Sequence, residues 1–208
     1  MPVHTIKTYY FDELPEEIKH KAYEKDHHNL DGEYYNADFR ATLEAFEEKF
    51  DISVKRWEVD SCRYTFDFDI MPMSNAEEIR DPIRLAVYMW NNYGNVIKKG
   101  KYYTRTYIDK DGHCYIKERY ATALREIHEY ALTGCFCDAD ILNPIIDCLT
   151  YKTLYETFDD LITDCLNRFF QTWSNCLEYS ETFEFYEDEA NACEWEYLAD
   201  GTKWRYSE

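Results

Sequence analysis

The sequence predicts an α+β fold in which antiparallel hairpins pack with several helices, and three observations support this class. Alternating apolar and polar residues mark short strands that come in pairs around turn sequences. Apolar residues at three- and four-residue spacing mark several helices. Strands and helices follow one another without the regular βαβ rhythm of a parallel sheet. The 208 residues are expected to form a single domain, 1–208, with an N-terminal α+β lobe (1–80) and a helix-rich acidic lobe (81–208) as the alternative.

The first 80 residues begin with a short β-like stretch and a well-marked helix start. Asp12 can cap the helix, and Pro15 fits its first turn because the missing N–H of proline costs nothing there. Further on, two alternating segments flank a polar turn and predict a hairpin. The expected elements are a strand at 5–11, a helix that starts at Asp12, a helix at 36–50, and strands at 52–59 and 64–70.

In the rest of the chain, glycine and proline mark the element ends. Pro82 opens a helix that Gly94 is expected to end. Asp109 begins an Asp-Lys-Asp-Gly turn between two tyrosine-rich strands. The expected elements are a helix at 82–94, strands at 101–108 and 113–117, helices at 121–132, 138–149 and 158–179, and a strand–turn–strand tail at 194–206.

The net charge of −19 is distributed unevenly along the chain. Residues 138–208 hold 17 acidic and 4 basic side chains, whereas the other 137 residues hold 25 and 19. Self-repulsion of this size weakens a compact state, and it is tolerated either for solubility or because a basic partner neutralises it. The acidic part is therefore a solubilising face or a surface that competes with nucleic acid for a basic groove.

Aromatic residues interleave with the acidic ones near the C-terminus, which purely solubilising tails do not show. Acidic charge with flat aromatic area suits a groove built for phosphates and bases, although an acidic outer face over a buried aromatic stripe gives the same pattern. Four of the acidic residues, Glu184, Glu187, Asp188 and Glu189, are expected on an exposed face. The candidate partner-binding residues are Glu178, Glu181, Glu184, Tyr186, Glu187, Asp188, Glu189, Glu194 and Glu196.

No set of catalytic or metal-binding residues stands out. The phosphate-binding glycine motifs, the nucleophile elbow and the zinc-protease motif are absent from the sequence. Weak metal candidates, each more simply explained as structural, are Cys135 and Cys137 with Asp138 and Asp140, the pair His27–His28 near Asp26, the pair Asp67 and Asp69, and the 109–112 turn. The eight cysteines are expected to be reduced and mostly buried. We therefore expect no enzyme activity, no cofactor and no metal.

Four stretches in order resemble a phage and prophage protein family labelled "antitoxin of toxin–antitoxin-like system". They are Thr8–Ala22, Leu132–Ile145, Asp159–Phe170 and Glu189–Thr202. The resemblance implies a small, acidic, non-enzymatic accessory protein carried by phages, and it implies no functional residues.

Together, charge and resemblance lead to one expected function and one alternative. We expect a phage-encoded stoichiometric inhibitor of a host nucleic-acid-guided defence nuclease, an anti-CRISPR-like protein whose acidic surface occupies a basic groove of a Cas effector or its guide complex. The alternative is an antitoxin that neutralises a cognate toxin by direct binding. The lysines and arginines at 98–110, interleaved with tyrosines, could hold a single strand of nucleic acid, but the net charge argues against nucleic-acid binding. The N-terminus lacks a signal-peptide pattern and no run is long enough to span a membrane, so a cytoplasmic location in the host is expected.

Overall fold

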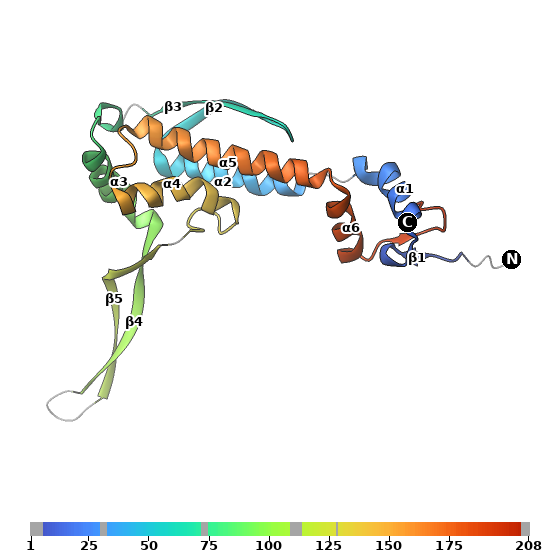
Figure 1. Cartoon of the computed structure of the whole chain (residues 1–208). Coiled ribbons are helices and arrows are strands. Elements are labelled where there is room, and N and C mark those ends of the chain that lie inside the picture. The colour runs from blue at the N-terminus through green and yellow to red at the C-terminus, as the bar shows by residue number, and fades with distance from the viewer. Residues whose placement is uncertain (1–5, 30–32, 72–74, 109–113, 128, 205–208) are drawn as a thin grey trace. The chain divides into compact units, whose positions relative to one another are not determined.

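The computed structural model describes residues 6–29, 33–71, 75–108, 114–127 and 129–204, and it confirms the α+β class (Figure 1). Within these described residues, three sheets of two strands each accompany the helices, with the pairings β1–β6, β2–β3 and β4–β5. The helices are α1 (Glu16–Asp26), α2 (Glu33–Phe50), α3 (Pro82–Ile97), α4 (Cys137–Tyr151), α5 (Phe158–Ser180) and α6 (Phe183–Ala192). The strands are β1 (Tyr9–Tyr10), β2 (Ile52–Val59), β3 (Tyr64–Ile70), β4 (Lys98–Ile108), β5 (Cys114–Ile127) and β6 (Glu196–Tyr197). Short 3-10 helices are η1 (Phe11–Glu13), η2 (His27–Asn29) and η3 (Asn75–Glu78).

The chain divides into two compact units, each assembled from segments that are distant in the sequence. Unit 1 comprises Met1–Ala37, Val59–Arg63 and Trp173–Glu208, and unit 2 comprises Asp38–Glu58 and Tyr64–Thr172. The lobes 1–80 and 81–208 do not coincide with these units. The reason is that β1 pairs with β6, through Tyr9↔Tyr197 and Tyr10↔Glu196, and so joins the two ends of the chain in one unit.

The core of unit 1 is aromatic and draws on both ends of the chain. Phe11 is fully buried, and its ring centroid lies 5.5 Å from that of Tyr186 and 5.4 Å from that of Tyr197. Leu14 and Ala22 complete the cluster from the N-terminal side. Tilted and edge-on ring contacts of this kind are favoured beyond the burial of apolar area, so the cluster holds α1, α6 and the β1–β6 pair together.

In unit 2, helices α2 and α4 lie beside the first part of α5 (Figure 1). Phe39 of α2 packs edge-on against Phe169 of α5, at 5.4 Å between centroids. The β2–β3 hairpin adds a layer through Tyr64 and Phe66, whose rings stack on Phe170 at 6.1 and 5.4 Å. The alternation along β3 thus separates a packed aromatic face from a solvated acidic one, as the sequence predicts.

One predicted helix and one predicted helix end are wrong. Residues 121–127, expected to begin a helix, are strand instead: β5 continues to Ile127, and its register reaches Lys98↔Ile127. Pairing with β4 supplies long-range backbone hydrogen bonds that override helix propensity. Gly94 does not end α3 but lies buried inside it, where a Cβ would come within 3.4 Å of the Trp90 ring.

At the N-terminal helix, the capping residue differs from the expected one. Asp12 belongs to η1, and Pro15 is the N-cap of α1, with its carbonyl accepting from Ile18 and Lys19. Helix α6 is a further difference, because the acidic and aromatic run that forms it was predicted only as a surface. Its N-cap is Thr182, whose hydroxyl accepts from the Phe185 N–H at 3.2 Å.

Candidate interaction surface

The predicted partner-binding residues lie on α5, α6 and the segment that follows, all within unit 1, and they differ in exposure. The sequence Glu184-Phe-Tyr-Glu-Asp-Glu places Glu184 and Asp188 four residues apart on α6, where both are exposed. The exposed members are Glu178, Glu181, Glu184, Asp188 and Glu194; the half-buried members are Glu187, Glu189 and Glu196; the buried member is Tyr186.

Tyr186 cannot contact a partner from its place in the structure. It is fully buried, and its hydroxyl lies 3.0 Å from that of Tyr197, also fully buried. Burial raises the pKa of both phenols, and the Tyr186 hydroxyl bond further raises that of Tyr197. Tyr186 is therefore buried, as the alternative interpretation of an aromatic stripe beneath an acidic face expects of it.

Glu187 has a structural partner rather than a free surface position. The ammonium group of Lys19, a residue only 8% exposed, lies 3.1 Å from Glu187 and 3.3 Å from Glu16. The hydrogen bond to Glu187 is the largest cause that raises the pKa of Lys19. Since removing Glu187 would leave a nearly buried cation with one exposed partner, this carboxylate serves to join α6 to α1.

The exposed acidic residues, in contrast, make no ion pair among the described residues. Like charges four residues apart repel along a helix, so Glu184 and Asp188 repel each other. The helix dipole favours acidic groups in the first turn, but Asp188 lies beyond that turn. Tyr179 is 40% exposed, and its hydroxyl donates to Asp188 at 3.2 Å. We name the residues Glu178, Tyr179, Glu181, Glu184 and Asp188 the acidic corner, because α5 ends and α6 begins among them.

Tyr179 is the aromatic residue that sequence reasoning left out of the predicted contact set. Its ring contacts Phe185 edge-on at 5.5 Å, and the residue is still 40% exposed. The buried positions of α5 recur at three- and four-residue spacing up to Trp173, and Tyr179 lies off that face. Tyr186, in contrast, lies on the face of α6 that buries Ala190. Tyr10, 49% exposed, adjoins Asp12, Asn191 and Glu194 in a shallow hollow of unit 1.

The charge of unit 1 as a whole agrees with this local picture. Its segments contain 19 acidic and 7 basic residues, whereas the longer unit 2 contains 23 and 16. The excess acidic charge belongs to a spatial unit that includes the N-terminal helix, and not to the C-terminal third alone.

The weak metal candidates have structural explanations. Asp138 is fully buried, and its carboxylate accepts five hydrogen bonds from Thr42, Leu132, Thr133 and Gly134. His27 stacks on Tyr23 at the end of α1. The residues Asp67 and Asp69 pair with Arg56 and Lys55 across the hairpin. In the described part of the chain no group of three or more His, Cys, Asp or Glu side chains could hold a metal ion, and the 109–112 turn lies outside the described residues.

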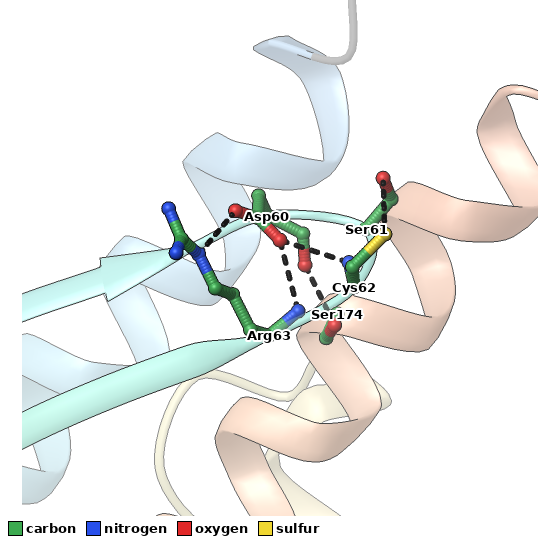
Figure 2. A network of polar contacts seen from close by, with 5 residues as sticks. All are labelled: Asp60, Ser61, Cys62, Arg63 and Ser174. Atoms are coloured by element: carbon green, nitrogen blue, oxygen red, sulfur yellow. Dashed lines mark hydrogen bonds and ion pairs between the residues drawn. The ribbon is translucent and has the colours of Figure 1, made fainter.

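The turn between β2 and β3 is a further polar network, shown in Figure 2. The Asp60 carboxylate accepts from the backbone N–H groups of Cys62 and Arg63, both at 2.9 Å, and these bonds lower the pKa of Asp60. The Asp60 carbonyl accepts from the Ser174 hydroxyl of α5 at 2.6 Å. These contacts stabilise the turn.

The cysteines show mixed burial. Cys137, Cys148 and Cys165 are buried, Cys135 and Cys176 are half-buried, and Cys62 and Cys193 are exposed. Burial raises the pKa of the Cys148 thiol to about 11 and raises those of Cys137 and Cys165 as well. A thiol with a raised pKa is a poor nucleophile, so the buried cysteines act as small apolar residues.

No described helix combines the length and the apolar character that crossing a membrane requires. Comparison of the chain with protein-family models, with curated proteins and with solved structures finds no match.

Proposed function

We propose that the protein is a stoichiometric inhibitor whose acidic corner occupies a basic nucleic-acid-binding groove of a host defence nuclease. The observation that carries this proposal is the exposure of several carboxylates, without ion pairs among the described residues, around one half-exposed tyrosine. Such a surface offers a basic groove both the charge and the flat area that a nucleic acid would offer. The resemblance to phage accessory proteins directs the proposal to nucleic-acid-guided nucleases.

The physical argument is that the acidic corner lowers the stability of its own helix. Repulsion between Glu184 and Asp188 disfavours α6 by a few tenths of a kcal/mol, and no described lysine or arginine compensates for it. A basic partner would relieve this repulsion on binding and would be steered toward the surface over a distance of about 10 Å at physiological salt.

The test uses a panel of purified CRISPR effector–guide complexes and measures guide-directed cleavage with increasing inhibitor. We expect one effector to lose cleavage at about one inhibitor per complex, and binding to compete with target nucleic acid. The variant Glu184→Lys with Asp188→Lys should slow association at least about tenfold, with a weaker dependence on salt than the unmodified protein. Glu187 stays unchanged, because its contact with Lys19 is structural.

A matched control is available on α2, where Glu44 and Glu48 are also exposed and four residues apart. Glu44→Lys with Glu48→Lys changes the net charge by the same amount and should leave the association rate within about twofold of the unmodified protein. If both variants slow association equally, the effect comes from net charge and not from the acidic corner. Unchanged cleavage across the panel would contradict the proposal and favour the antitoxin alternative, for which co-expression with a cognate toxin is the test.

A further inference from the structure

The register of the β4–β5 ribbon separates charged residues by face. Residues paired directly across an antiparallel ladder share a face, and the face alternates along each strand. The pairs Lys101↔Ala121, Tyr103↔Arg119, Arg105↔Lys117 and Tyr107↔Tyr115 therefore belong to one face. The alternate pairs Tyr102↔Tyr120, Thr104↔Glu118, Thr106↔Ile116 and Ile108↔Cys114 belong to the other.

All four basic residues of these eight pairs fall on the first face, together with three tyrosines, and no acidic residue falls there. We name this set, Lys101, Tyr103, Arg105, Tyr107, Tyr115, Lys117 and Arg119, the basic ribbon face. The opposite face carries no basic residue and contains the one acidic residue of the set, Glu118. The basic ribbon face is therefore locally positive, although the net charge of the chain is −19.

Arg105 and Lys117 occupy directly opposed register positions on this face. The ribbon of eight pairs is about 25 Å long, enough to follow several nucleotides.

We infer that the basic ribbon face binds single-stranded nucleic acid. Basic residues neutralise the phosphates, and tyrosines interleaved with them can stack on unpaired bases, the combination that single-strand-binding proteins use. The expectation that the chain does not bind nucleic acid considered only the total charge, whereas phosphate contacts depend on the local charge. This inference does not depend on the acidic corner, and each can fail without the other.

The experiment measures fluorescence anisotropy of a labelled oligothymidylate of about 15 nucleotides with the full-length protein at about 50 to 200 mM salt. The variant Arg105→Gln with Lys117→Gln should raise Kd at least about tenfold and lower the salt slope by about 1.4, since each phosphate contact on a single strand contributes about 0.7. Removing the opposed charges should not unfold the ribbon. If circular dichroism nonetheless shows a loss of structure, Lys101→Gln with Arg119→Gln is measured instead.

The matched control replaces two basic residues elsewhere in unit 2, Lys49→Gln with Arg84→Gln, which are exposed on α2 and α3. This control should keep the Kd within about twofold of the unmodified protein. The variant Tyr103→Leu with Tyr107→Leu should also weaken binding, because stacking contributes to it. Undetectable binding, equal loss in variant and control, tighter binding of a duplex, or equal binding of polyglutamate would each overturn the inference.

Discussion

Asp138 carries a buried carboxylate that the described residues balance with hydrogen bonds instead of a cation. Two threonine hydroxyls donate to one oxygen, at 2.8 and 3.0 Å. Three consecutive backbone N–H groups donate to the other, at 2.8 to 2.9 Å. Charge-assisted bonds of this kind are about twice as strong as neutral ones, so Asp138 fixes the loop before α4 and joins it to Thr42 of α2.

We predict that Asp138→Ala lowers the free energy of unfolding by about 3 kcal/mol, because it leaves buried donors without acceptors. Asp140, two residues further on, is the matched control. Burial raises the pKa of Asp140 and is only partly offset by the Thr172 hydrogen bond and the nearby Arg168, so removing this charge also removes a desolvation cost. Asp140→Asn should therefore change stability by less than about 0.5 kcal/mol. Urea denaturation of both variants checks the prediction, and comparable losses would contradict it.

The buried hydroxyl pair of Tyr186 and Tyr197 makes unit 1 sensitive to alkaline pH. Both pKa values are raised in the folded state, whereas in the unfolded chain a tyrosine titrates near 10. Unfolding therefore releases protons at high pH, so the stability from this pair is complete below about pH 10 and falls as pH rises above it.

We predict that Tyr186→Phe with Tyr197→Phe loses less stability between about pH 9 and about pH 11 than the unmodified protein. Each single substitution should cost about 1 kcal/mol or more at neutral pH, and the double variant should cost less than their sum, because no hydroxyl is then left unpaired. Thermal denaturation across this pH range is the measurement. An additive double variant with the same pH dependence as the unmodified protein would disprove the coupling.

At the scale of elements, α4 shows how a helix end can be imperfect and still form. Its C-cap is Lys152, in the left-handed region at φ 59°, where glycine is the usual residue. The Lys152 N–H donates to the Cys148 carbonyl at 3.0 Å, so the geometry is satisfied while the side chain adds strain. The burial of eight residues along α4 stabilises the helix by more than this strain costs.

We predict that Lys152→Gly raises the free energy of unfolding by about 0.5 to 1 kcal/mol, because glycine adopts this conformation without strain. The same substitution at Lys49, inside the last turn of α2, should lower stability by up to about 1 kcal/mol. Denaturant unfolding of the two variants measures whether each substitution raises or lowers the free energy of unfolding. A loss at both positions would mean that the Lys152 side chain contributes more than its backbone costs.

For the whole molecule, the closure of unit 1 depends on a tight turn after β6. Gly201 has φ +82°, and a Cβ there would lie 3.0 Å from the Ile18 carbonyl oxygen of α1. Its N–H donates to the Leu198 carbonyl at 3.0 Å, which closes the turn after β6. A single glycine therefore allows the C-terminal segment to approach the N-terminal helix.

We predict that Gly201→Ala lowers the protection of amide hydrogens in α1 and α6 while leaving α4 unchanged. Gly134→Ala is the control, since Gly134 has a similar φ of +89° but no neighbour within 4 Å of a Cβ. It should show only the local conformational cost of about 1 kcal/mol. Hydrogen exchange measured by mass spectrometry separates the two cases, and equal effects on α1 would show that the contact with Ile18 is unimportant.

By itself, the sequence determined the α+β class, most helices, the β2–β3 hairpin and the excess of acidic charge, because these depend on local periodicity and composition. The tertiary structure decided the rest. Pairing with β4 makes residues 121–127 a strand, although their helix propensity favours a helix. Pairing of β1 with β6 placed the acidic segment in one unit with the N-terminus. Packing against Phe11 and Tyr197 buried Tyr186. Contacts between distant residues have no signature in local spacing, and for that reason the exposed residues of the acidic corner and the charge separation of the ribbon emerged only from the fold.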